Sequence, residues 1–110
     1  MNSKEVQAYV NRQIGDQWAE SNAHGVDLRG SLVTPHKTKV INRIVRDGKI
    51  SDSVVEVWVV LEEVKGGDGY TMFFDEKDGG FGLATKGFKC DPHPVICGYY
   101  GDFWTTFKGM

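Results

Sequence analysis

The sequence predicts an α+β fold, in which an N-terminal helix packs on a curved antiparallel β-meander of about five or six strands and a short C-terminal helical turn follows. Three observations predict it. Apolar residues recur at helical spacing near the N-terminus, β-branched residues surround an Asp47-Gly48 dipeptide, and glycine-rich segments separate short apolar runs further on. With 110 residues, 40% of them hydrophobic and 25% charged, the composition is that of one globular domain covering residues 1–110.

The first element is an amphipathic helix. Asn2 or Ser3 is the expected N-cap, and Glu5 stands three residues after Asn2, as in a capping box. Its apolar face is formed by residues three or four apart: Val6, Tyr9, Val10, Ile14 and Trp18. We expect the helix to continue to about residue 24, before Gly25, although Gly15-Asp16 could divide it.

A β-hairpin forms the centre of the predicted sheet. After a short strand at residues 26–33 and Pro35, Asp47-Gly48 is the preferred two-residue hairpin turn, because both positions need a positive φ. If Arg46 and Lys49 flank the turn, one face pairs Val45 with Ile50, Arg43 with Asp52, Ile41 with Val54, and Lys39 with Glu56. The other face carries Val40, Val55 and Val57 and continues to Val59 and Leu61, so we expect it to face the core.

Three shorter strands are expected after the hairpin, at residues 70–74, 81–85 and 95–100. Glycine-rich turns at residues 65–69 and 75–80 separate the first two from their predecessors. The second turn does not match a phosphate loop, because strand-like sequence follows it where a helix should begin. Asp102 is the expected cap of the final helical turn.

Charge and cysteine content limit the partners and the compartment. The formal net charge is -2 and the pI is about 5.9, so nucleic acid is not an expected partner, although residues 29–49 hold six bases and one acid. No apolar run has the length of roughly 20 residues that a membrane span needs, and no secretory signal precedes the first helix. We therefore expect a cytoplasmic protein without membrane association and with free thiols.

Cofactor and metal chemistry find little support in the sequence. Cys90, His93 and Cys97 form the densest set of metal-binding residue types, but a structural zinc site usually needs four ligands in paired short spacings. The set remains a weak candidate, and no metal or cofactor is expected. Either cysteine could be a nucleophile beside His36 or His93, yet no catalytic motif surrounds them, so no catalytic residue is assigned.

Two functional hypotheses remain, and the first is a non-enzymatic binding protein. Eleven of the 13 aromatic residues lie from Trp58 onward, and adjacent aromatics cannot all face one core. Some should contact a protein partner or a second copy in a homo-oligomer, with a dimer as the expected form: Trp58, Tyr99, Tyr100, Phe103, Trp104 and Phe107. Small size, acidic loops and the lack of catalytic motifs are typical of immunity-type or mobile-element accessory proteins.

The second hypothesis is an α+β-roll protein with a small-ligand pocket, or an enzyme of that type. Its polar group would be Glu56, His36 or His93, placed in an apolar cavity where burial could shift its pKa. The hairpin register weakens the argument for Glu56, because a cross-strand ion pair with Lys39 explains that carboxylate equally well.

Overall fold

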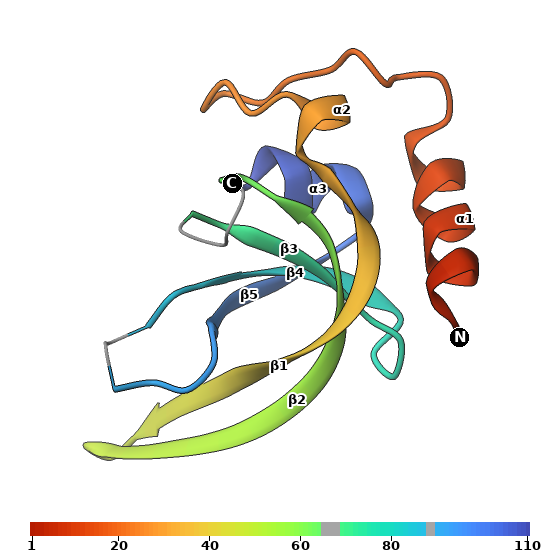
Figure 1. Cartoon of the computed structure of the whole chain (residues 1–110). Coiled ribbons are helices and arrows are strands. Elements are labelled where there is room, and N and C mark those ends of the chain that lie inside the picture. Colours follow the sequence, from red (N-terminus) through yellow and green to blue (C-terminus); the bar gives the residue numbers. More distant parts are fainter. Residues whose placement is uncertain (65–68, 88–89) are drawn as a thin grey trace.

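The computed structural model describes residues 1–64, 69–87 and 90–110 (Figure 1). It confirms the α+β fold, with α1 and α3 near the two ends of the chain and a curved sheet between them. The elements are α1 (Ser3–Ile14), α2 (Leu28–Ser31), β1 (Leu32–Arg46), β2 (Lys49–Glu62), β3 (Thr71–Asp75), β4 (Gly80–Thr85), β5 (Val95–Gly101) and α3 (Phe103–Lys108). Residues 65–68 of the predicted turn and Phe88 lie outside the described residues.

Helix α1 begins as predicted and ends ten residues earlier than expected. The Asn2 side chain accepts from the Glu5 amide at 2.9 Å and the Glu5 carboxylate accepts from the Asn2 amide at 3.0 Å, which completes a capping box. The helix stops at Ile14 because Gly15, with φ 66°, takes a conformation that cannot continue it. The predicted helix to residue 24 is therefore wrong. The chain does break at Gly15-Asp16, as the alternative had it, but residues 16–24 form turns and not a second helix.

The segment before the hairpin also differs from the prediction. Residues 26–33 are expected to form a strand, but Asp27 caps the short helix α2 by accepting from the Gly30 amide at 2.8 Å. An Asp side chain that satisfies a free amide favours a helical turn over an extended chain at this point. Strand β1 then begins at Leu32 and continues without interruption to Arg46.

The central hairpin has the predicted turn and the predicted register. Asp47 and Gly48 have φ values of 51° and 73°, as a two-residue turn of this type requires. Arg46 lies opposite Lys49, Arg43 opposite Asp52, and Lys39 opposite Glu56. The ladder of paired residues extends from this turn to the pair of His36 and Val59, beyond which the register shifts.

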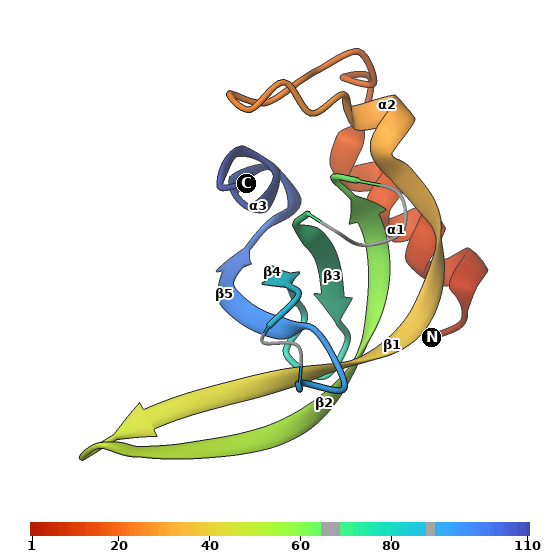
Figure 2. The same ribbon diagram turned by 60° about the vertical axis from the view of Figure 1, so that its left-hand side comes forward.

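The five strands of the described chain form a closed barrel in the order β1-β2-β3-β4-β5 (Figure 2). Each strand is antiparallel to the next along the chain, and β5 returns to β1 in a parallel pairing. That last pairing is limited to one bridge, between Ile41 and Val95, where the Ile41 amide donates to the Pro94 carbonyl at 2.8 Å. The antiparallel meander is as predicted, whereas nothing in the sequence pattern indicated this parallel closure.

The sheet is buried on both faces where it forms the barrel. An inner core joins side chains from all five strands: Val40, Val55, Val57, Phe73, Ala84 and Ile96. An outer core lies between the opposite face of the sheet and the helices; Val6, Val10 and Ile14 enter it from α1, and Phe103 and Phe107 from α3. The prediction of a single core face is therefore incomplete, because Trp58 and Val60 are buried on the face expected to be open.

A close approach of backbone and ring occurs at Gly82 in the inner core. A Cβ atom at this position would lie 2.5 Å from Phe73 Cζ and 2.6 Å from the Gly98 carbonyl oxygen of the neighbouring strand. Both distances are far below van der Waals contact, so only glycine fits without displacing a ring or a strand. Phe73 itself is fully buried and packs edge-on against Tyr99, with ring centroids 5.4 Å apart.

Candidate functional site

The outer half of the β1–β2 hairpin projects away from the barrel, and we call residues 42–54 the arm (Figure 2). Strands β1 and β2 have 15 and 14 residues, whereas β3, β4 and β5 have five to seven. The short strands cannot cover the long hairpin, so β2 pairs with β3 only from Trp58 onward. The arm is consequently a two-stranded ribbon with little of the barrel beside it.

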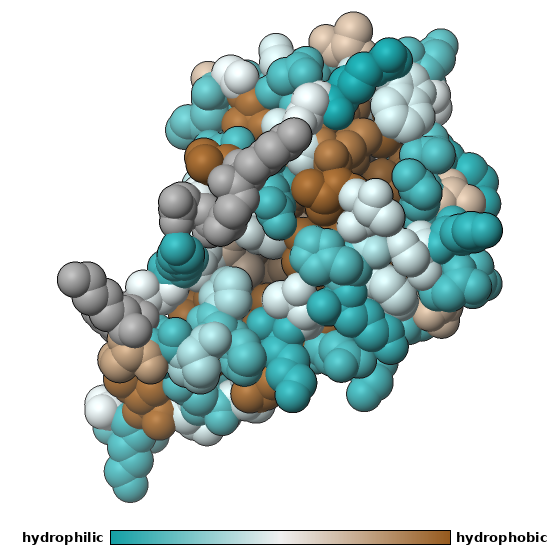
Figure 3. Space-filling model, viewed as in Figure 1, coloured by the Kyte–Doolittle hydropathy of each residue, from teal (hydrophilic) through white to brown (hydrophobic). Residues whose placement is uncertain are grey.

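Apolar side chains are concentrated on this arm. Val45 is 64% exposed, Ile50 67%, Val54 59% and Ile44 41%. They are half of the large hydrophobic residues that are exposed in the described chain, and in Figure 3 apolar colouring marks the end of the hairpin. Val45, Ile50 and Val54 share one face of the ribbon, because Val45 lies opposite Ile50 and side chains two residues apart point the same way. Such a patch marks an interaction surface more often than scattered exposed residues do.

A charged clamp fixes the base of the arm. The Arg43 guanidinium donates to both Asp52 oxygens at 2.8 Å and to Asp91 at 2.9 and 3.3 Å. These bonds hold the pKa of Asp52 below its usual value and raise that of Arg43. Because Asp91 belongs to the segment before β5, the clamp joins that segment to the hairpin and sets the direction in which the arm leaves the barrel.

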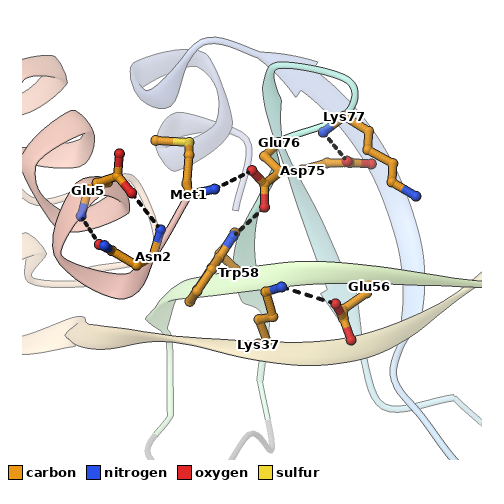
Figure 4. A network of polar contacts seen from close by, with 9 residues as sticks. All are labelled: Met1, Asn2, Glu5, Lys37, Glu56, Trp58, Asp75, Glu76 and Lys77. Atoms are coloured by element: carbon orange, nitrogen blue, oxygen red, sulfur yellow. Dashed lines mark hydrogen bonds and ion pairs between the residues drawn. The ribbon is translucent and has the colours of Figure 1, made fainter.

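The second candidate site is an open pocket of about 350 Å³ formed by β1, β2 and the β3–β4 turn. Its lining is mostly charged, and it contains Lys37, Glu56, Val57, Trp58, Glu76 and Lys77. The Trp58 indole N–H donates to Glu76 Oε1 at 3.2 Å, and Glu76 Oε2 accepts from the Met1 ammonium at 2.9 Å (Figure 4). The bond from the ammonium, reinforced by that from the indole, lowers the pKa of Glu76.

Glu56 lies at this pocket but in different surroundings from those predicted. Its carboxylate pairs with Lys37 at 3.4 Å, and its side chain is 56% exposed. The register places Lys39 directly opposite Glu56, yet the ion pair is made diagonally by Lys37, whose ammonium also lies 5.3 Å from the Trp58 ring centroid. An exposed, paired carboxylate is not the buried group in an apolar cavity that the enzyme hypothesis requires.

The aromatic residues near the C-terminus divide between the core and the surface. Phe103 and Phe107 are buried in the outer core, and Trp104 is half-buried with its indole N–H donating to the Gln13 carbonyl at 2.9 Å. Trp58 is 7% exposed. Tyr99 and Tyr100 remain exposed, at 41% and 38%, so the predicted aromatic surface is reduced to these two rings.

Tyr99 is held by the buried carboxylate of Asp75, the last residue of β3. Its hydroxyl donates to Asp75 at 2.9 Å, and Asp75 also accepts from the amides of Lys77 and Asp78. Partial burial, together with this hydrogen bond, raises the pKa of Tyr99 to about 12. Asp75 therefore fixes a turn and a tyrosine, which is a sufficient structural reason for its burial.

The histidines and cysteines are dispersed. His36 is exposed, with Nδ1 3.3 Å from the Thr34 carbonyl, and His93 is half-buried in the segment before β5. Cys90 and Cys97 are exposed free thiols, and Cys97 lies within β5. Among residues 1–64, 69–87 and 90–110, no three His, Cys, Asp or Glu side chains are arranged to hold a metal ion, so Cys90, His93 and Cys97 do not form one site.

Comparison with protein families, curated proteins and solved structures returns no match. Function must therefore be inferred from the contacts of the chain itself. Within the described part of the chain, no helix combines the length and the apolar character needed to cross a membrane.

The arm is the feature that sequence reasoning missed, although a signal for it was present. The predicted hairpin strands extend from about residue 38 to residue 61, while the strands expected after them are only five or six residues long. Strands this much longer than their neighbours must extend beyond them in a meander. Comparing predicted strand lengths would have identified residues 42–54 as unsupported and their apolar side chains as exposed.

Proposed function

We propose that this chain is a non-enzymatic binding protein and that the arm is its partner-contact surface. The observation that supports the proposal is the exposure of Ile44, Val45, Ile50 and Val54 on a projecting ribbon. Burying such side chains on binding is favourable by roughly 25 cal/mol per Å² of apolar surface. This free energy is not gained while the side chains stay in water. A small accessory protein of the immunity type would act in this way, by occupying a surface of its partner.

The arm is suited to bind by strand addition. A strand edge without a neighbour presents unpaired N–H and C=O groups, which an extended segment of another protein can pair with. In the described chain, β2 has no neighbour on its second edge before Trp58, and Ile50 and Val54, four residues apart on this strand, point to the same face. A matching partner would offer an extended segment with two apolar residues four positions apart.

The proposal moves the contact surface away from the C-terminal aromatic residues. Phe103 and Phe107 cannot contribute to a partner surface without leaving the core, and Trp104 packs against α1. Tyr99 and Tyr100 could add contact area at another place, but two half-exposed rings form a smaller apolar surface than the arm. The expectation of a non-enzymatic binding protein is retained, with a different set of contact residues.

Site-specific photo-crosslinking in cells that express the protein tests the proposal. A photoreactive amino acid at position 45 or 50 should give a discrete cross-linked species. The same label at exposed Ala23, in the connection between α1 and α2 at the other end of the molecule from the arm (Figure 1), should give none. Adding Val54→Lys to the protein labelled at position 50 should abolish the species, because it places a charge in the contact. Equal labelling from positions 23 and 50, or no product from either arm position, would contradict the proposal.

The charged pocket favours a second candidate, the binding of a small charged ligand. Glu56 and Lys77 present opposite charges at its rim, so a zwitterion such as an α-amino acid has the matching chemistry. Calorimetric titration with a panel of α-amino acids should then give saturable binding that Glu56→Gln weakens and Glu20→Gln does not. Absence of heat with every member of the panel would remove this candidate.

A further inference from the structure

The unpaired edge of the arm belongs chiefly to β2. Strand β2 pairs with β1 from Lys49 onward, but its pairing with β3 starts at Trp58. Residues 49–57 therefore have one edge without a neighbouring strand in the described chain. Along this edge, residues 49–54 and Glu56 are exposed, so another strand can approach. The edge contains Ile50 and Val54, which are two of the three apolar residues on one face of the arm.

We propose that the partner of the arm is a second copy of this chain, with the two β2 edges joined as antiparallel neighbours about a twofold axis. This inference rests on the proposed function, because it identifies the strand that the arm captures. A twofold contact uses the same surface of both copies, and an antiparallel pair of identical strands satisfies that condition. The two barrels then lie at opposite ends of a continuous four-stranded ribbon made from the two arms.

Symmetry restricts the register of such a pair. A twofold axis that relates antiparallel strands of one sheet is perpendicular to it, so each face of one copy continues as the same face of the other. A residue on the face of Ile50 can therefore lie opposite only residues of that same face, namely Asp52, Val54 or Glu56 in the neighbouring registers. Three registers that differ by shifts of two residues remain to be compared.

Side-chain chemistry selects one of them. Setting Ile50 opposite Val54 creates two pairs of apolar side chains, one on each side of the axis. Shifting by two residues in either direction sets Ile50 against the carboxylate of Asp52 or of Glu56. A larger shift toward the turn leaves only the tip of the arm paired. A larger shift away from the turn sets Asp52 opposite Glu56, so that two negative charges face each other. The geometry therefore points to the Ile50–Val54 register.

The chosen register also accounts for the residue on the axis. Asp52 then lies opposite its own copy, an arrangement that repulsion would ordinarily disfavour. Each Asp52 is bound through both oxygens by Arg43 at 2.8 Å, so each of the two carboxylates that meet on the axis has a guanidinium beside it, which Asp91 shares. The clamp that fixes the arm thus reduces the repulsion between the two Asp52 side chains.

Size-exclusion chromatography with light scattering, over a dilution series, tests self-pairing directly. Wild type should approach twice the chain mass at high concentration, and Ile50→Lys and Val54→Lys should remain at the chain mass. Val64→Lys is the matched control and should still dimerise, because Val64 is an exposed valine like Val54 but lies beyond the end of β2 and outside the arm. Circular dichroism checks that the variants fold, which their exposed positions favour.

Disulfide trapping tests the register. In a Cys90→Ser, Cys97→Ser background, the double variant Ile50→Cys, Val54→Cys should form a covalent dimer on mild oxidation, because opposed Cα atoms in an antiparallel pair are about 4.5–5.5 Å apart, within disulfide reach. Neither single variant should cross-link. Cross-linking by a single variant, or none by the double variant, would overturn the register.

Wild type that remains monomeric at every concentration would overturn self-pairing altogether. The proposed function would survive that result if labels on the arm still cross-link to a different protein in cells. It would fail separately if the arm gives no specific cross-link of any kind.

Discussion

Replacement of Gly82 by alanine gives the sharpest test of the barrel interior. The new Cβ atom would lie 2.5 Å from Phe73 Cζ, 3.0 Å from Phe73 Cε1 and 2.6 Å from the Gly98 carbonyl oxygen. Carbon atoms in contact prefer about 3.5–4.0 Å, so roughly 1 Å of space is missing on two sides. Phe73 is fully buried and cannot rotate freely, and the carbonyl belongs to β5, so the β4–β5 pairing must open.

The expected loss is at the upper end of the range for overpacked cores, about 3 kcal/mol. That is roughly a hundredfold change in the folding equilibrium. With an m value of about 1.5 kcal/mol/M, the urea midpoint would fall by about 2 M. Circular dichroism during urea titration at neutral pH measures it for wild type and variant.

Gly98→Ala is the matched control, because the same methyl group is added on the adjacent strand. The atoms nearest to a Cβ at Gly98 belong to the Tyr100 side chain, at 3.4 Å or more, which is ordinary contact. We expect a change below about 1 kcal/mol there. Combining Gly82→Ala with Phe73→Leu should cost less than the sum of the two, because the ring atoms that clash are removed. The reasoning is refuted if Gly82→Ala and Gly98→Ala have equal midpoints.

Three further predictions concern the clamp, the tyrosine and the outer core. Because Arg43 keeps the pKa of Asp52 low, the stability from this ion pair is present above the ordinary Asp pKa and is lost as pH falls through the lowered pKa. Arg43→Gln should therefore lower the free energy of unfolding at neutral pH and make it depend less steeply on pH in acid. Urea titrations at several pH values measure both effects. The pKa of Tyr99 is raised to about 12, so the stability from its hydrogen bond is present below the ordinary tyrosine pKa of about 10 and is lost as pH rises through about 12. Tyr99→Phe should remove the phenolate transition at the highest pH from an ultraviolet titration and make the free energy of unfolding depend less steeply on pH in alkali. An unchanged titration would contradict the assignment. Phe103→Ala should cost about 3–5 kcal/mol in urea unfolding while exposed Thr105→Ala stays within about 0.5 kcal/mol, and similar values for the two would show that α3 does not seal the outer core.

The sequence was sufficient where local chemistry determines structure. The Asp47-Gly48 turn admits few alternatives, and it fixed every pair of the hairpin as far as His36. The caps at Asn2 and Asp102 are predicted for the same reason, since each supplies an oxygen to a free amide a few residues away. The helical spacing of apolar residues continues past Gly15, however, and our prediction gave it more weight than the glycine. In the structure Gly15 has a positive φ and the helix ends before it.

The candidate site was harder to predict because exposure depends on what other segments cover. Phe103 and Phe107 lie one helical turn apart, which indicates a shared side, but their burial depends on Phe81 and the α1 face, which the helix itself does not specify. Ile50 and Val54 have the pattern of ordinary strand residues and are exposed only because β3 starts too late to cover them. The ion pair of Glu56 with Lys37 is diagonal, and residue pairing alone predicts the direct neighbour.

The parallel pairing between Ile41 and Val95 is a consequence of the odd number of strands in the barrel. In a meander each strand reverses the direction of the last, so a fifth strand runs the same way as the first, and a barrel that closes with an odd number of strands must contain one parallel joint. Parallel pairing is the weaker kind, and here one bridge and the Arg43–Asp91 contact hold it. Local opening should therefore start at this joint, so that the Ile41 amide exchanges with solvent well before the amides deep in the β2–β3 ladder. Water would then reach the inner core while the helices still cover the outer one.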